Sequence, residues 1–221
     1  MVPTGARVAD VGTDHGLVPI ALVDRGRASW CVAIDTDDRV LRPLRARLAR
    51  DPIARPIEVR TGDGLAPVTG DDRIDTVILA GLGSDTVIRI LERSEPPPTD
   101  GPRWILQPQT GPDAIRAWLR AHDHVLVDER IVEERGRPYL VLAAEPGVET
   151  GYDGPPGLEP DDLYAAGPLL VARRDPVALA TWIATARRLD RIVEGLPPGS
   201  GERVRRDRAR AHRIVGALGP A

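Results

Sequence analysis

The sequence has 221 residues, enough for one α/β domain of roughly 150 residues and a smaller addition. Its formal net charge is -3, and no uninterrupted apolar stretch approaches the roughly 20 residues that span a bilayer, so we expect a soluble, cytoplasmic protein and exclude a membrane partner. The single cysteine, Cys31, excludes an internal disulfide, and because it lies in an apolar run we expect it to be buried in a strand.

Short apolar runs alternate with helical patterns from residue 7 to about residue 145. The first five runs are nearly all apolar, as expected for strands buried on both faces of a parallel sheet. Only a turn-like segment separates the last two, which predicts an antiparallel hairpin at the end of the sheet. The predicted strands are Arg7–Val11, Trp30–Asp35, Pro56–Arg60, Ile74–Ala80, Arg103–Gln107, Val125–Glu133 and Tyr139–Ala144. This pattern predicts the Rossmann-like α/β fold of class I methyltransferases, which use S-adenosylmethionine (SAM).

A Gly- and Pro-rich stretch from Glu145 to about Pro160 is predicted to be a loop between a methyltransferase domain, residues 1–160, and a C-terminal unit, residues 161–221. Apolar residues in that unit recur in steps of three and four, which predicts a coiled-coil-like helical hairpin with its turn at residues 197–201. The predicted seam consists of Leu179, Trp182, Ala186, Leu189, Val193 and Leu196 in one helix and Val204, Ala211, Val215 and Leu218 in the other.

The first predicted strand leads into the sequence DVGTDHG, residues 10–16. Glycine there lets the backbone approach a ligand, and the next helix N-terminus offers free N–H groups. NAD and FAD sites carry GxGxxG, which is missing, so an NAD-dependent oxidoreductase is disfavoured. We predict cofactor contacts from Asp10, Gly12, Thr13 and His15.

Further candidates follow the next three strands. Asp35 ends the second strand, where its carboxylate can accept hydrogen bonds from ribose hydroxyls, and Asp63 follows the third, where it can accept the adenine amino group. Gly81 lies in a turn of small residues after the fourth. Ligands of open α/β sheets bind outside the strand carboxyl ends, so these residues predict a SAM site. The alternative is that each carboxylate is solvated or caps a helix.

Gln107 and Gln109 follow the fifth strand and face the same predicted edge. Amide groups both donate and accept hydrogen bonds, so they can bind the edge of a neutral base. The alternative is that they satisfy loop backbone. His122, His124 and His212 are expected on the surface, and with no metal-ligand pattern in the sequence we expect no metal.

These motifs resemble the bacterial tRNA (adenine(22)-N1)-methyltransferase family, known as TrmK. The resemblance covers residues 6 to 145 and is carried by ADVGTDHGLVP at 9–19, GDGL at 62–65 and LQP at 106–108, and the C-terminal hairpin is similar to the family's coiled-coil appendage. It implies SAM as methyl donor, tRNA as partner and N1 of an adenine as acceptor. The sequence departs from the family at GLGS, residues 81–84, and at Gln109.

Neutral adenine N1 carries its own lone pair, so the protein has mainly to align the base with the methyl group and shield the site. We expect Asp14 to stabilise the positive charge that develops on the base. Gln107 and Gln109 would hold the base.

The C-terminal unit carries nine arginines and five acids from residue 175 onward. Four of the arginines recur at helical spacing and are predicted to contact tRNA phosphates: Arg203, Arg206, Arg210 and Arg213. A solvated coiled-coil face and a dimer interface are the alternatives, so a monomer and a homodimer both stay open. Two other functions also stay open: a non-catalytic RNA-binding relative, and a SAM methyltransferase acting on a small molecule or protein.

Overall fold

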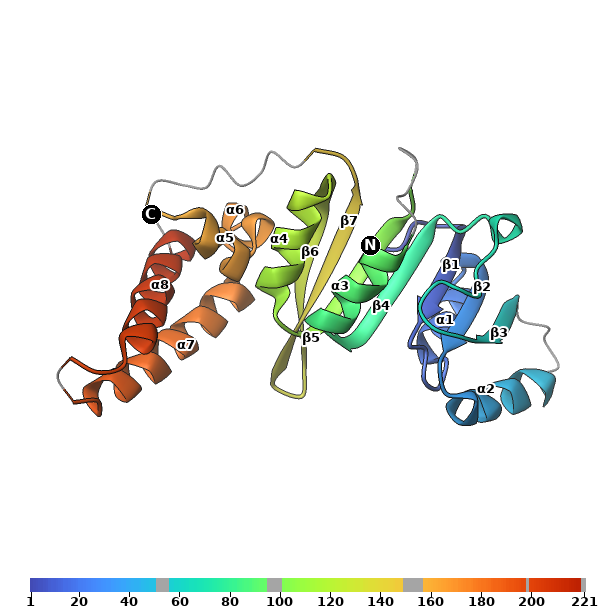
Figure 1. The fold of residues 1–221 in the computed structure, drawn as a ribbon, viewed down its shortest axis with the longest axis horizontal. Helices are drawn as coiled ribbons and strands as arrows, with labels where there is room; N and C mark the ends of the chain where they lie inside the picture. The colour runs from blue at the N-terminus through green and yellow to red at the C-terminus, as the bar shows by residue number, and fades with distance from the viewer. Residues whose placement is uncertain (51–55, 95–100, 149–156, 198, 220–221) are drawn as a thin grey trace.

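The fold is described from a computed structural model, which places residues 1–50, 56–94, 101–148, 157–197 and 199–219. A seven-stranded sheet forms its centre, in the order β3-β2-β1-β4-β5-β7-β6 (Figure 1). The strands are β1 (Ala6–Val11), β2 (Ala28–Asp35), β3 (Ile57–Thr61), β4 (Thr76–Gly83), β5 (Arg103–Thr110), β6 (His124–Glu134) and β7 (Arg137–Pro146). β1 to β5 pair in parallel and β7 is antiparallel to both neighbours. The predicted Rossmann-like methyltransferase fold is therefore confirmed.

Helices cover both faces of the sheet. α1 (Leu17–Asp24) and α2 (Asp38–Arg50) pack on one face, where Ile20, Ala33 and Leu44 form a buried cluster. α3 (Ser84–Arg93) and α4 (Pro112–Ala121) pack on the other face, against the largest core cluster. The remaining helices are the short 3-10 helix η1 (Gly70–Asp72), α5 (Pro160–Ala166), α6 (Pro168–Ala172), α7 (Pro176–Glu194) and α8 (Glu202–Leu218).

One strand departs from the expected burial. β3 is an edge strand and none of its residues is fully buried: Ile57 and Val59 pack only partly against the core, and Arg60, with its side chain 21% exposed, bonds Asp72 of η1. The expectation of burial on both faces was wrong for this strand. Cys31 of β2 is fully buried as predicted, and burial raises the pKa of its thiol to about 12.

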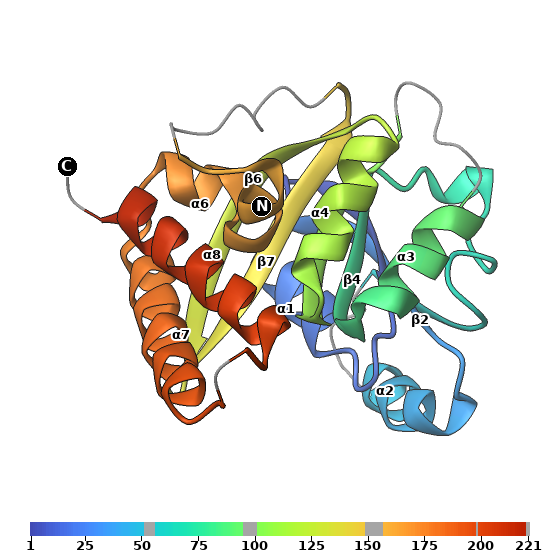
Figure 2. The ribbon, with the colours of Figure 1, turned by 60° about the vertical axis from the view of Figure 1, so that its left-hand side comes forward.

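The predicted helical hairpin is confirmed: α7 and α8 pack together through Ala186, Leu189 and Ala211. The predicted seam residues Trp182, Val204 and Val215 pack against this cluster, whereas the fully buried Ile214 belongs to the main core. Figure 2 shows the hairpin beyond β6, at one end of the sheet.

One continuous core joins the hairpin to the sheet and its helices. Ile214 and Leu218 of α8 belong to the same buried cluster as Leu119 of α4. The predicted boundary between residues 160 and 161 falls at the start of α5, and much of the loop expected at 145–160 lies outside the described residues. The division into two units stays a prediction.

Candidate cofactor and methyl-transfer site

The candidate site lies at the carboxyl edge of the parallel strands. Two backbone hydrogen bonds connect its loops: Gly12 donates to the carbonyl of Ile34 (2.9 Å), and Gly62 donates to the carbonyl of Asp35 (3.0 Å). The loops after β1, β2 and β3 are thus held side by side. The sheet order places the loops after β4 and β5 next to the loop after β1.

The loop between β1 and α1 follows a tightly curved path. Gly12, Asp14 and Gly16 all have positive φ, at 74°, 50° and 67°. A Cβ at Gly16 would lie 2.5 Å from the side chain of Leu44 in α2, so only glycine fits there. Aspartate is one of the few other residues that adopts this conformation readily. The loop leaves the side chains of Asp14 and His15 well exposed, at 65% and 61%.

Asp35 is a strong candidate for holding the cofactor. One carboxylate oxygen accepts the backbone N–H of Asp14 (3.2 Å) and the other accepts that of Asp37 (3.0 Å). Asp35 is only partly buried, and each carboxylate oxygen has a second lone pair for another donor. The side chain therefore fixes the β1–α1 loop and can still receive a ribose hydroxyl.

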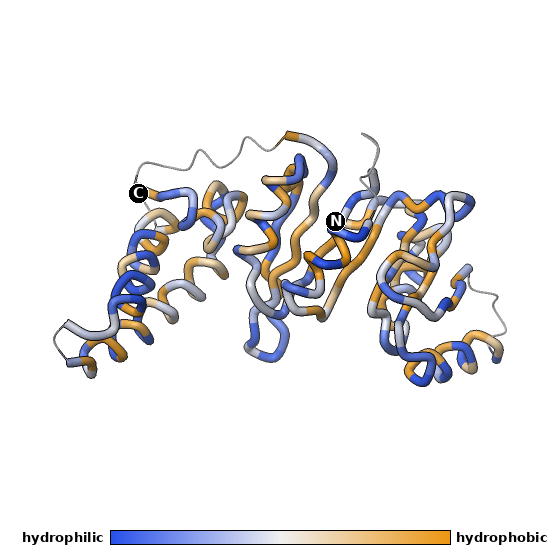
Figure 3. The backbone as a smooth tube through the Cα atoms, in the orientation of Figure 1, coloured by the Kyte–Doolittle hydropathy of each residue, from blue (hydrophilic) through white to orange (hydrophobic). Residues whose placement is uncertain are grey.

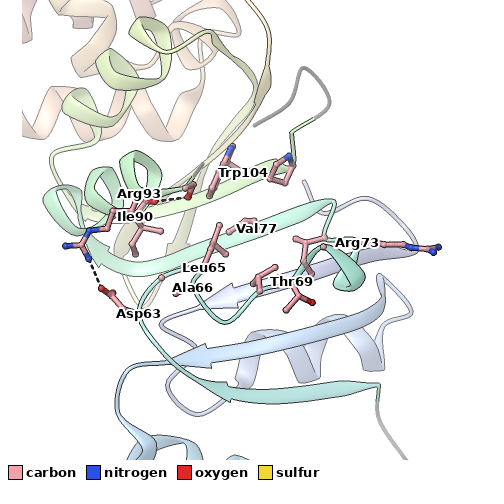
Figure 4. Close-up of a pocket in the computed structure, with 15 residues that line it drawn as sticks. Asp63, Leu65, Ala66, Thr69, Arg73, Val77, Ile90, Arg93 and Trp104 are labelled. Atoms are coloured by element: carbon pink, nitrogen blue, oxygen red, sulfur yellow. Dashed lines mark hydrogen bonds and ion pairs between the residues drawn. The ribbon is translucent and has the colours of Figure 1, made fainter. Parts of the chain in front are cut away.

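Asp63 lies at the mouth of a pocket of about 840 Å³ (Figure 4). The pocket runs from this edge along the sheet face, over Leu65 and Val77 towards Arg73. Asp63 forms an ion pair with Arg93 (2.7 Å). Both side chains are more than half exposed, so separating them costs little. Recognition of an adenine amino group by Asp63 stays a prediction, and it requires that Asp63 first separate from Arg93.

The two glutamines after β5 have different surroundings. The Gln107 side-chain carbonyl accepts the backbone N–H of Gly81 (2.9 Å), and its amide donates to the carbonyl of Pro108 (3.3 Å). Gln107 thus stabilises the β4 turn, the alternative that the sequence left open. Gln109 is exposed, and its side-chain nitrogen Nε2 would lie 3.8 Å from a Cβ atom placed on Gly81, so the side chain lies beside the turn at Gly81. Gln109 is the better placed of the two to bind a base.

Asp10 and Thr13 lie beneath the loop, where they are only 3% and 8% exposed. The Thr13 hydroxyl donates to the Asp10 carboxylate (2.6 Å). Burial raises the pKa of Asp10 to about 6, although the Thr13 hydrogen bond opposes the shift. This arrangement favours support of the loop over direct contact with a cofactor, and the predicted contact stays untested.

The raised pKa predicts a pH-dependent effect of Asp10→Asn. The protonated form is favoured in the folded protein, so the wild-type loses stability as pH rises from the ordinary carboxyl pKa through about 6. Asparagine does not titrate, so the variant should gain roughly 2–3 kcal/mol relative to wild-type between pH 4 and pH 8. Urea unfolding of both proteins across this pH range measures the difference. Free energies of unfolding that change with pH in the same way in both proteins would contradict a raised pKa of Asp10.

The serine that departs from the family pattern is accommodated by its surroundings. Ser84 begins α3 and is 8% exposed. Its hydroxyl oxygen lies 2.5 Å from where a Cβ on Gly111 would be, and Gly111 has a φ of 58°. The missing side chain of Gly111 thus leaves room for Ser84.

The predicted RNA-binding arginines divide into two pairs. Arg213 binds both carboxylate oxygens of buried Asp162 in α5 (2.8 Å each), and Arg210 lies 3.5 Å from the same group. Arg203 and Arg206 are exposed, and within the described ranges neither forms an ion pair. Figure 3 shows hydrophilic residues recurring along α8. Arg210 and Arg213 thus attach the hairpin to the core, while Arg203 and Arg206 are available to a ligand.

The expected surface position of His124 was wrong. His124 is only 4% exposed, because it begins β6 opposite Pro146 of β7 and its ring centroid lies 5.8 Å from that of Trp118. Burial lowers the pKa of His124. His122 is exposed and stacks on Trp118, and exposed His212 bonds Asp190 (3.0 Å).

The sequence also gave no indication of a buried ion pair between Arg116 of α4 and Glu129 of β6. Across the part of the chain that the structure places, no three His, Cys, Asp or Glu residues are grouped as a metal site. None of the helices placed there is long and apolar enough to cross a membrane.

Comparison with known proteins shows the family to which this chain belongs. The family model described as tRNA (adenine(22)-N(1))-methyltransferase matches residues 8–217. The enzyme of that name from Bacillus subtilis is 32% identical over 194 residues, covering 87% of this chain and 80% of the relative.

Solved structures agree with the family model. The crystal structure of the B. subtilis m1A22 tRNA methyltransferase TrmK superposes with a TM-score of 0.79 at 29% identity, covering 98% of this chain and 92% of that one. A Streptococcus pneumoniae protein assigned to the same modification was solved with S-adenosyl-L-methionine and superposes with a TM-score of 0.77 at 28% identity, covering 99% and 92%. The chain therefore belongs to the tRNA (adenine(22)-N(1))-methyltransferase family.

Proposed function

We propose that the protein transfers a methyl group from SAM to N1 of an adenine in tRNA, and that it does so in the cytoplasm. The observation that carries this proposal is the placement of Asp35, Asp14 and Gln109 around one strand edge, in a chain that belongs to this family. Asp35 can hold a ribose, and Gln109 is exposed to a base. The Asp14 carboxylate lies 3.7 Å from the His15 ring, but both side chains are well exposed, so Asp14 can exchange this contact for a base.

The residues at the edge fit SAM. The backbone at Gly12 and Gly81 has positive φ and no side chain, so a ligand can approach it closely. Asp35 offers a carboxylate to the ribose hydroxyls, and the S. pneumoniae relative binds SAM. When bound, SAM supplies a methyl group already activated on a sulfonium.

The acceptor nitrogen needs no prior deprotonation, since neutral N1 has its own lone pair. The protein's task is therefore to fix the base with N1 directed at the methyl carbon. Gln109 would bind the base edge, and the carboxylate of Asp14 would stabilise the positive charge that the base acquires. Because N1 lies on the pairing edge, the adenine must be unpaired or turned out of its stack, at a cost of a few kcal/mol.

We also propose that the α7–α8 hairpin contacts tRNA through Arg203 and Arg206. Support comes from their exposure and from the excess of arginine in this unit. Phosphate contacts of this kind position an RNA without reading its sequence.

The test of function is incubation of the protein with SAM and an unmodified tRNA transcript, followed by nucleoside mass spectrometry. We expect 1-methyladenosine to appear at one position. Binding of tRNA without turnover would favour the non-catalytic relative. Methylation of a small metabolite or protein, with none of RNA, would replace the proposed substrate.

Asp35→Ala is expected to weaken SAM binding by about 10- to 150-fold, because hydrogen bonds to a charged group contribute about 1.5–3 kcal/mol. Asp37→Ala is the matched control, since Asp37 is a partly exposed neighbour that pairs with Arg39. Calorimetric titration with SAM measures both. Equal affinities in the two variants would remove Asp35 from the cofactor site.

A further inference from the structure

Helix α2 is strongly basic. Its 13 residues include five arginines and one acid, Asp38. This gives α2 a net charge of +4, equal to that of the segment from residue 175 onward, in a chain whose total is -3. The rest of the chain therefore carries a net charge of -11, and positive charge is concentrated in two elements.

The position of α2 connects it to the candidate site. Leu41 and Leu44 are buried on its inner side, and Leu44 packs against Gly16 of the β1–α1 loop. Arg45, in the middle of the helix, bonds the hydroxyl of Thr61 at the end of β3 (3.0 Å). The helix therefore lies across the carboxyl ends of β2 and β3 (Figure 1).

The outer side of α2 presents arginines that a ligand can reach. Arg39 and Arg42 lie near Asp37 (2.7 Å) and Asp38 (3.6 Å), but their side chains are 80% and 72% exposed. Such exposed pairs contribute little, so their arginines can exchange partners readily.

Arg47 and Arg50 are exposed in the last turn of the helix. Among the residues that the structure places, no acid pairs with either of them. Within the residues that the structure places, the positive charges of both arginines therefore stay uncompensated and can attract a phosphate.

Figure 1 shows α2 and the α7–α8 hairpin at opposite ends of the sheet, with the candidate site between them. Neighbouring strands lie about 4.8 Å apart, so seven strands separate the two basic elements by roughly 30 Å. An RNA that presents an adenine to Asp14 and Gln109 would extend to both sides. We propose that α2 is a second phosphate-binding surface for tRNA, centred on Arg47 and Arg50; this inference rests on the proposed function.

The test compares two double variants with equal loss of charge. Arg47→Gln/Arg50→Gln removes the proposed contacts. Arg25→Gln/Arg120→Gln is the control, because both arginines are exposed at the ends of α1 and α4, just before β2 and β6, at the opposite edge of the sheet. Arg203→Gln/Arg206→Gln serves as the comparison on the hairpin. For each protein, thermal unfolding checks the fold, SAM titration checks the cofactor site, and the dissociation constant of tRNA is measured against salt concentration.

Each phosphate contact contributes about 0.7–0.9 to the slope of log K against log salt, so the α2 variant should lose about 1.4–1.8 from that slope. Its tRNA affinity at low salt should fall about tenfold. SAM affinity and the methylation rate at saturating tRNA should stay unchanged.

A slope equal to that of the Arg25/Arg120 control would overturn the role of α2. If wild-type protein itself neither binds nor methylates tRNA, the proposed function fails. A wild-type enzyme that methylates tRNA normally, with a salt slope insensitive to the α2 change, refutes only the inference about α2.

Discussion

Glu129→Ala is expected to lower the free energy of unfolding by about 3–5 kcal/mol, because it leaves the Arg116 guanidinium buried without its partner. The two side chains are 1% and 0% exposed and meet at 2.7 Å. The other Glu129 oxygen accepts the backbone N–H of Leu169 in α6 (2.9 Å), and Arg116 donates to the carbonyl of Tyr164 in α5 (2.6 Å). The pair thus joins the methyltransferase domain to the helices that lead into the hairpin.

Arg130→Ala is the matched control, since Arg130 is the next residue of β6, is 63% exposed and pairs with Asp128. Exposed pairs contribute at most about 1 kcal/mol, so this change should be small. Urea unfolding at neutral pH measures both. A loss in Glu129→Ala no larger than in Arg130→Ala would contradict the assigned role.

Gly167→Ala tests the same junction without removing a charge. Gly167 has a φ of 91°, and a Cβ there would lie 2.7 Å from an Arg116 nitrogen and 2.9 Å from a Glu129 oxygen. Alanine should therefore destabilise the junction by displacing the pair. The requirement for glycine comes from both the backbone conformation and the close approach of the two charged groups.

The parallel strands, the closing hairpin and the site's edge of the sheet could be predicted from the sequence, because the first five strands are short, apolar and each followed by a helical segment. Asp35 was identifiable for the same reason, as the first acid after a buried strand. Partnerships between distant residues could not be predicted. Asp63 with Arg93, and Asp162 with Arg213, are 30 and 51 residues apart along the chain, and no local pattern records such pairs.

Gln107 illustrates a second limit. The sequence placed Gln107 and Gln109 equally at the end of β5, and because residues two apart in a strand share a face, strand alternation does not distinguish them. Which of the two side-chain amides accepts a hydrogen bond from a backbone N–H depends on the turn at Gly81, and Gly81 belongs to another strand, β4. Burial of His124 similarly depends on its pairing with β7 and on Trp118 in α4.

Asp14→Asn is expected to slow methyl transfer by about 10²-fold or more while SAM affinity stays unchanged. The adenine acquires positive charge during transfer, and a neutral amide stabilises that charge less than a carboxylate does; comparable losses of one electrostatic contact cost about 10²–10³-fold in turnover. Asparagine tolerates the φ of 50° at this position, and the backbone N–H that bonds Asp35 is retained, so the loop should keep its shape.

Asp123→Asn is the control for Asp14→Asn, because Asp123 is also an exposed aspartate with a positive φ (53°) and it precedes β6, away from the carboxyl edge of the parallel strands. The measurement is the single-turnover rate at saturating SAM and tRNA, with SAM affinity determined by titration. An Asp14→Asn rate within threefold of wild-type would remove Asp14 from the chemistry. A fall in SAM affinity that accounts for the whole loss would instead place Asp14 in the cofactor site, since a residue that acts only on the acceptor base leaves cofactor binding unaltered.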